Sequence, residues 1–246
     1  MSIITRAVEY EHEGQAFEGL LAMADTGPAQ RPVVLVLHDW QGRSEGQEQF
    51  ARRLTAWGYA AFAVDVYGKG KRGTTTQECQ ALMMPFMQDR ALLRRRLLRA
   101  VEVVRQRPEA NPENMAAIGF CFGGLCALDL ARAGAELKGA ASFHGTLSPP
   151  GLPTASPFKT KVIAFHGWDD PFAPPDHVAA LGKELTAAGA DWQLHAYGAT
   201  VHGFMNEAAN NPAMGIVYNE QSARRAWAAL ETFLAEAFGL LAGFTL

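Results

Sequence analysis

The amino-acid sequence predicts an α/β fold: a mostly parallel sheet, preceded by an N-terminal antiparallel hairpin and covered by helices on both faces. Two observations lead to this fold class. Short apolar runs alternate along the chain with stretches whose apolar residues recur every three or four positions. The first such run, Pro32–Leu37, is almost continuously apolar, as expected for a strand buried on both faces. No change in composition marks a domain boundary, so we expect one domain over residues 1–246.

Each predicted element rests on a local pattern. Residues 3–24 are expected to form the hairpin, because Glu13-Gly14 is a suitable turn between two long extended stretches. Apolar runs bounded by Gly, Pro or polar residues are interpreted as strands, and amphipathic stretches as helices. The remaining predicted strands cover residues 32–37, 60–64, 115–118, 139–143, 161–165 and 192–196. The predicted helices cover residues 46–57, 89–106, a segment that starts after Cys121, 176–188 and 218–238.

Two further segments are interpreted as connections. Residues 67–87 are rich in Gly, Thr and Met and are expected to be irregular. Residues 145–159 contain four prolines and are expected to form a surface connection.

Composition restricts the classes of function. The formal net charge is −3 and charged residues make up 19% of the chain, so no long-range attraction to nucleic acid or to an anionic membrane is expected. The arginines at 94–96 and 99 lie in the amphipathic 89–106 stretch, and we interpret them as a solvated helix face in preference to an anion site. No apolar run is long enough to span a bilayer.

The three cysteines include no C-x-x-C pair, which argues against a disulfide framework. The N-terminus lacks a basic region followed by an apolar core, so it does not read as a signal peptide. We therefore expect a soluble, cytoplasmic protein.

The strongest functional signal surrounds Cys121. It follows a predicted strand and opens a predicted helix, and Gly119 and Gly123 flank it in the pattern G-x-C-x-G that a nucleophile elbow requires. The helix N-terminus would favour a thiolate, and the free amide of Phe122 could face a developing oxyanion. A structural role is the preferred interpretation for Cys126 and Cys79, which lack this context.

A base and an orienting acid are expected on loops that follow later strands. His202 lies in a Gly-flanked loop near the chain end and is preferred as the base over His166 and His144, which stand at strand ends where they could bond locally. Asp170 precedes Pro171 in a rigid loop and is preferred as the acid over its neighbour Asp169.

Three segments together resemble the dienelactone hydrolase family of α/β-hydrolases: G-F-C-F-G-G at 119–124, H-G-W-D-D-P-F-A-P at 166–174 and V-H-G-F at 201–204. The resemblance runs from the strand at Val33 to the terminal helix. It implies an α/β-hydrolase fold, a Cys-His-Asp triad, a small-molecule ester or lactone substrate, and no metal or organic cofactor. It also implies that the Trp40 amide is the second oxyanion donor, and that Asp39 contacts the resting thiol and gates its ionisation.

The family binds its substrate carboxylate with arginines, one of them just after the catalytic histidine, where this chain has Met205 and Asn206. The sequence therefore favours a neutral ester or lactone. Candidate lining residues, each equally compatible with core packing, are Trp40, Met83, Met84, Phe86, Trp168, Phe172 and Phe204. Two other classes stay open: a peptidase or acyltransferase with the same triad, and a non-catalytic, redox-sensing protein. The oligomeric state is left undetermined.

Overall fold

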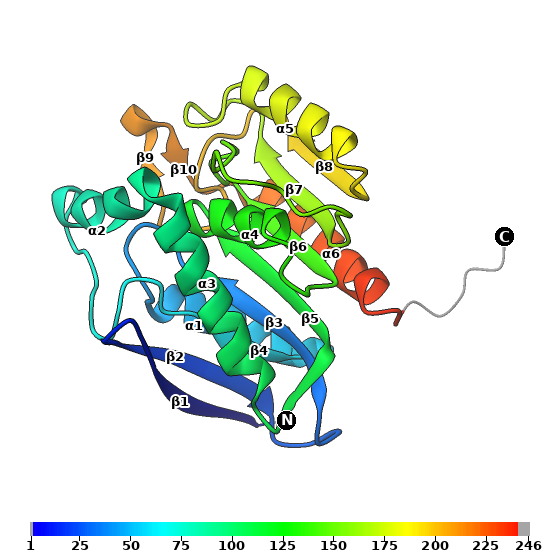
Figure 1. Cartoon of the computed structure of the whole chain (residues 1–246). Helices are drawn as coiled ribbons and strands as arrows, with labels where there is room; N and C mark the ends of the chain where they lie inside the picture. Colours follow the sequence, from blue (N-terminus) through cyan, green and yellow to red (C-terminus); the bar gives the residue numbers. More distant parts are fainter. Residues whose placement is uncertain (1, 241–246) are drawn as a thin grey trace, which may run out of the picture.

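The computed structural model describes residues 2–240, so the outermost residues of the predicted 1–246 unit lie outside it. Eight strands form one twisted sheet in the order β1-β2-β4-β3-β5-β6-β7-β8 (Figure 1). The β1–β2 hairpin is antiparallel and joins β4 antiparallel, whereas β4 to β8 in this order are parallel. The strands are β1 Ile3–His12, β2 Gln15–Ala24, β3 Arg31–Leu37, β4 Ala60–Ala63, β5 Ala110–Phe120, β6 Gly139–Phe143, β7 Lys161–Gly167 and β8 Trp192–Tyr197.

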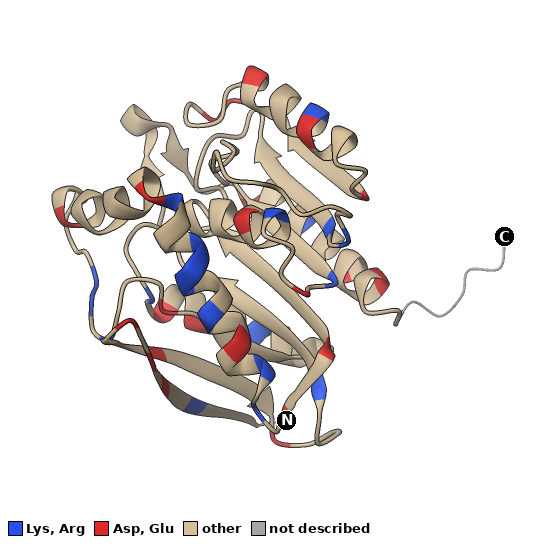
Figure 2. Ribbon diagram, in the orientation of Figure 1, with Lys and Arg blue, Asp and Glu red and all other residues tan. Residues whose placement is uncertain are grey.

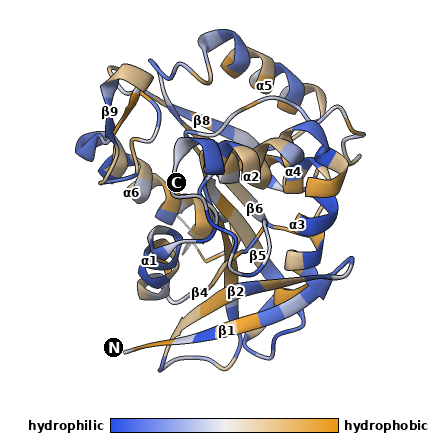
Figure 3. Ribbon diagram, turned by 90° about the vertical axis from the view of Figure 1, so that its left-hand side faces the viewer, coloured by the Kyte–Doolittle hydropathy of each residue, from blue (hydrophilic) through white to orange (hydrophobic). Residues whose placement is uncertain are grey.

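Helices cover both faces of the sheet, as predicted. On one face lie α3 (Arg90–Arg105), α4 (Phe122–Arg132) and α5 (Pro175–Ala187), and on the other α1 (Glu45–Leu54) and α6 (Glu220–Ala237) (Figure 1). Alternate residues of β3 show this directly. Val33 packs in the same cluster as the α3 and α4 side chains, whereas Val34 packs with those of α1 and α6. Charged residues lie mainly on the helices, the hairpin and the loops (Figure 2). Along the helices polar and apolar residues alternate, as expected for amphipathic helices (Figure 3).

The prediction that residues 67–87 are irregular is wrong for the second part of this segment. Half of residues 67–87 forms α2 (Thr76–Gln88), which begins with a capping box: the Thr75 hydroxyl accepts from the Glu78 amide and the Glu78 carboxylate accepts from the Thr75 amide. The helix has a weakly developed apolar face and contains Pro85, which explains why its periodicity is faint. A short β9–β10 pair at 210–211 and 216–217 was also not predicted.

β5 begins five residues earlier than expected. Its first residue, Ala110, pairs with Arg31, and the register then shifts before Met115 pairs with Val33. The polar run at 111–114, which contains Pro112, bulges out of the ladder, so no apolar pattern reveals this start.

The arginines of α3 contact the protein itself. Arg96 donates to the carbonyl oxygens of Val66 and Tyr67, and its guanidinium lies over the rings of Phe17 and Phe86. The helix face that was predicted to be solvated therefore partly contacts the protein, and its arginines connect α3 to β2 and to the segment after β4.

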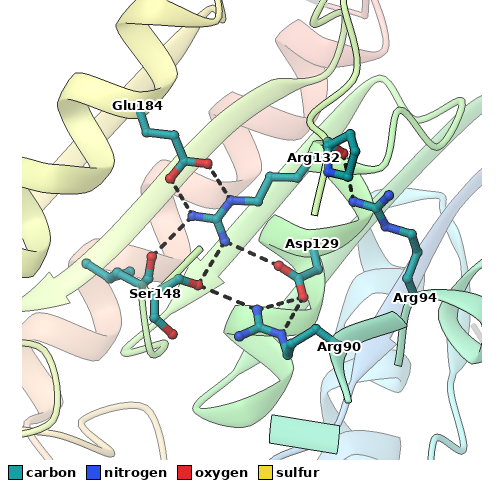
Figure 4. Close-up of polar contacts among 8 residues, drawn as sticks. Arg90, Arg94, Asp129, Arg132, Ser148 and Glu184 are labelled. Atoms are coloured by element: carbon teal, nitrogen blue, oxygen red, sulfur yellow. Dashed lines mark hydrogen bonds and ion pairs between the residues drawn. The ribbon is translucent and has the colours of Figure 1, made fainter. Parts of the chain in front are cut away.

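A buried ionic network joins three helices (Figure 4). Asp129 of α4 pairs with Arg90 of α3 at 2.6 Å, and Arg132 pairs with Glu184 of α5 at 2.7 Å. Both arginines also donate to the Ser148 carbonyl oxygen. The network therefore holds α3, α4, α5 and the loop after β6 in one arrangement. None of the helices in residues 2–240 is long and apolar enough to cross a membrane.

Candidate active site

Cys121 sits at a sharp turn between β5 and α4. Its backbone angles are φ 55° and ψ −116°, outside the regions that a non-glycine residue ordinarily adopts. A Cβ at Gly119 would overlap the Gly123 carbonyl, and a Cβ at Gly123 would overlap that of Leu37. Both predicted elbow glycines are therefore required by close backbone approach. The turn leaves the Cys121 side chain partly exposed, whereas Cys79 and Cys126 are buried.

His202 and Asp170 meet through a hydrogen bond from two separate loops. The distance between His202 Nδ1 and Asp170 Oδ2 is 2.8 Å, and both residues are buried. The other carboxylate oxygen of Asp170 accepts from the Phe172 amide at 2.8 Å. Asp169 is exposed, and the structure shows no hydrogen bond between it and His202 within residues 2–240. Of the two candidate acids, geometry thus selects Asp170.

The charge environment of His202 favours its protonated form. Burial alone would lower the pKa of this imidazole, but the negative charge of Cys121 and the hydrogen bonds to Asp170 and Cys121 outweigh burial and raise the pKa to about 10. Cys121 and Asp170 therefore act on one imidazole from two sides. These contacts favour an imidazolium at His202.

Within residues 2–240, His144 and His166 lack the local hydrogen bonds that were expected of their rings. They were expected to bond locally, yet no hydrogen-bond partner for either His144 nitrogen, or for His166 Nε2, exists in the described part of the chain. Each imidazole is buried, and burial lowers the pKa of each. Neither can replace His202 as the base that Asp170 orients.

The loop after β3 is held in place around Trp40. The Tyr67 hydroxyl donates to the Trp40 carbonyl at 3.1 Å, and the Gly73 amide donates to the Gln41 carbonyl at 2.9 Å. His38 is fixed between the Asp39 carbonyl and the Val66 amide. Among residues 2–240 no acceptor takes a hydrogen bond from the amides of Trp40 or Phe122. A role of these two amides in binding an oxyanion stays a prediction.

Asp39 is held by its own loop and by α1. Its carboxylate accepts from the Gln41 amide at 2.8 Å and from Gln47 Nε2 at 3.4 Å. Burial raises the pKa of this carboxyl, and these two bonds oppose the rise. No hydrogen bond between Asp39 and Cys121 is found over residues 2–240, so the gating role stays a prediction.

The predicted lining residues separate into two groups. Phe172 is 42% exposed and its ring centroid lies 4.9 Å from that of His202, and Trp168 is 46% exposed. The prediction for Phe204 is wrong: it is fully buried, because its ring packs under His144 and Tyr197 and not at the surface. Phe86 is likewise a core residue, stacked on Tyr67.

Sequence reasoning missed Tyr67 and Gln47, which fix the loop of Trp40 and Asp39. Gln47 was detectable as the third residue of a helix capped by Ser44, but nothing in the sequence connects it to Asp39. Two cavities of about 500 and 380 Å³ flank residues 148–152, and no predicted triad residue lines them. Within the described chain, no three His, Cys, Asp or Glu side chains are grouped as metal ligands would be.

Comparisons with known proteins identify the family of this chain. The model of the dienelactone hydrolase family matches residues 17–238. A protein of Aquifex aeolicus, provisionally named a carboxymethylenebutenolidase, is 28% identical over 225 residues, covering 89% of this chain and 93% of its own. The solved structure of a dienelactone hydrolase-like promiscuous phosphotriesterase from metagenomic libraries has a TM-score of 0.90 and 30% identity, with 97% and 100% coverage. A structure named m3DLH has a TM-score of 0.89 and 31% identity, with 96% and 99% coverage.

The family model spans most of the chain, and both similar structures are covered nearly end to end. The chain therefore belongs to the dienelactone hydrolase family and is a hydrolase of carboxylic esters or lactones.

Proposed function

We propose that this hydrolase cleaves uncharged carboxylic esters and lactones through a Cys121–His202–Asp170 triad and an acyl-thioester intermediate. The observation that carries the proposal is the meeting of three distant segments: the strained Cys121 turn and the 2.8 Å pair of Asp170 with His202. Nucleophilic catalysis requires a nucleophile, a base and an orienting acid side by side, and these are the roles proposed for Cys121, His202 and Asp170.

In the proposed reaction the Cys121 thiolate attacks the carbonyl carbon, and the amides of Trp40 and Phe122 bind the oxyanion that forms. Protonated His202 gives its proton to the departing alkoxide as the carbon–oxygen bond breaks. Neutral His202 then takes a proton from water, the hydroxide adds to the thioester carbon, and the acid leaves as Cys121 departs. Asp170 holds the imidazole through Nδ1 in both steps.

The preference for uncharged substrates rests on the segment after His202. Phe204 and Met205 are buried, and the Asn206 side chain accepts from the Ala208 amide, so this segment offers no cation to the site. The exposed ring that lies against His202 is instead the aromatic side chain of Phe172. A cation from residues 71–72 would be the alternative source of acid recognition.

The test measures hydrolysis of p-nitrophenyl esters and small lactones, each in a neutral and an acidic version. We expect Cys121→Ala to abolish turnover while the matched control Cys79→Ala, at a buried cysteine of α2, retains it. Neutral substrates should have the higher kcat/KM. A Cys121→Ala enzyme with wild-type turnover would refute the thiol mechanism. A dialkyl p-nitrophenyl phosphate belongs in the panel, because one similar protein is a phosphotriesterase.

Two other functions are separated by one added substrate and one added measurement. A peptidase would also cleave a peptide p-nitroanilide, which the proposed esterase should leave intact. A redox sensor would show no turnover at all, while Cys121 would be oxidised reversibly to a sulfenic acid.

A further inference from the structure

His144 is a buried imidazole in contact with the proposed base. It follows β6 directly and is 4% exposed, and its ring centroid lies 5.0 Å from that of His202 at an interplanar angle of 66°. Neither of its ring nitrogens has a partner within residues 2–240. A buried polar group without a partner is destabilising, so hydrogen bonding is not what this imidazole contributes.

The backbone at His144 is strained and firmly held. Its φ is 38°, a left-handed value that His adopts more often than most residues. The His144 amide donates to the Phe165 carbonyl at 2.8 Å, and the preceding Phe143 carbonyl accepts from the Cys121 amide at 3.0 Å. His144 is therefore fixed between the strand end that carries the nucleophile and the strand that leads to Asp170.

The loop that follows His144 is anchored to the same helix as the nucleophile. Arg132 of α4 donates to the carbonyl oxygens of Leu147 and Ser148, each at 3.2 Å (Figure 4). Asp129 and Glu184 hold the Arg132 guanidinium in turn. A strained backbone persists only where its surroundings determine it, and here the ionic network provides that determination.

Rings contact His202 from two directions. Phe172 approaches at 4.9 Å and 67°, and it is 42% exposed. His144 approaches at 5.0 Å from the interior, where it also packs against Phe204 at 5.2 Å. The hydrogen bond from His202 Nδ1 to Asp170 anchors one side of the ring, and an edge-to-face neighbour limits its tilt. Of the two neighbouring rings, His144 is the buried one.

His144 also suits this position because it stays uncharged. Burial, followed by the charge of His202, lowers the pKa of His144 well below its ordinary value. A neutral ring packs against the imidazolium of His202 without repelling it.

We infer that His144 is a positioning residue: its neutral imidazole sets the tilt of the His202 ring and thereby aims His202 at both the Cys121 thiol and the leaving group. His144 does not touch the substrate, since it lies beneath His202 and is closed off from solvent. This inference rests on the proposed triad. The experiment therefore includes Cys121→Ala. Retained activity of Cys121→Ala would refute the proposed triad, whereas the variants below test the role of His144 by itself.

The test compares three variants on one neutral p-nitrophenyl ester. His144→Asn removes the ring but tolerates the left-handed backbone. His144→Phe keeps an aromatic ring without its nitrogens. His195→Asn is the matched control, since His195 packs edge-to-face on Phe165 at 5.5 Å and is a half-buried residue of β8.

We expect His144→Asn to lower kcat by about ten- to hundredfold, the effect of a base displaced by a fraction of an ångström, with KM unchanged. His144→Phe should recover most of this loss, and His195→Asn should behave as wild type. The acidic limb of the kcat/KM profile should also shift in His144→Asn, because the thiol and imidazole no longer pair as closely.

Several results would overturn the inference. One is a folded His144→Asn enzyme with wild-type kcat and an unchanged pH profile. Another is a KM that changes as much as kcat, which would mean direct substrate contact. If His144→Asn does not fold, His144→Phe decides: a folded His144→Phe enzyme with less than about a tenth of wild-type kcat shows that the nitrogens act, not the packing.

Discussion

The two sides of the candidate active site differ in how deeply their side chains are buried. On the nucleophile side, every residue of α4 is buried, and the Gly123 position is in backbone contact with the end of β3. On the opposite side, Trp168, Phe172 and Met214 are 46%, 42% and 38% exposed. We expect the nucleophile side to stay rigid during the reaction and the exposed side chains of the opposite side to meet the incoming substrate. The predictions below test this division, beginning with the largest expected effect.

Gly123→Ala should have the largest effect, because the added Cβ would overlap the Leu37 carbonyl and push α4 away from β3. Overpacking of this kind costs about 1–3 kcal/mol or more of the free energy of unfolding. It would also separate the amides of Trp40 and Phe122, so we expect kcat to fall by about a hundredfold. Urea unfolding and ester hydrolysis measure the two effects.

Gly198→Ala is the matched control, since a Cβ at Gly198 meets no atom within 4 Å and its φ is not left-handed. Stability and kcat should both stay near wild type. Equal behaviour of the two variants would contradict the idea that the nucleophile side is the rigid one.

The pH dependence should distinguish the two roles of His202. Its pKa is raised to about 10 in the folded enzyme, so kcat/KM for an alkyl ester, whose leaving group needs a proton, should fall as the pH rises through about 10. The same sign holds for stability. The contribution of the protonated imidazole is fully present below its ordinary pKa of 6.5 and is lost as the pH rises through about 10.

Asp170→Asn removes one of the groups that raise the pKa of His202, so the basic limb of its pH profile should move to lower pH. A limb that stays in place would show that Asp170 does not act on this imidazole.

Phe172→Ala should have the smallest effect. Removing an exposed ring from the outer side of His202 should raise KM for bulky acyl groups by about fivefold and leave kcat within about threefold of wild type. Trp168→Ala is compared with it, because Trp168 packs against His166 and no ring contact with His202 is found for it within residues 2–240. A large loss of kcat in Phe172→Ala would mean that the outer ring, and not His144, fixes the base.

Most of the sheet and the residues of the proposed triad could be predicted because their signals are local. Gly119, Cys121 and Gly123 lie within one turn, and the apolar runs of β3 and β4 need no partner to be recognised. The helix α2 was missed because a mixed Thr- and Met-rich stretch with Pro85 hides its period. Its one clear signal is the pair Thr75 and Glu78.

The remaining misses depend on tertiary packing. Nothing in the sequence shows that Phe204 turns inward under His144, or that Gln47 reaches back to Asp39. Two histidines at similar strand ends also look alike in sequence. Only the fold shows that His144, at 5.0 Å, packs edge-to-face on the ring of His202, whereas for His166 no such ring contact is found within residues 2–240.

The close approach at Gly119 and Gly123 bears on how such enzymes diverge. Every single-nucleotide missense change of a glycine codon adds a side chain, and at these two positions any side chain meets backbone. Substitutions at Gly119 and Gly123, which flank Cys121, are therefore expected to be tolerated poorly. Phe172 has no such constraint on its solvent side, so drift or laboratory selection can alter the accepted substrates there while the hydrolytic chemistry is inherited unchanged.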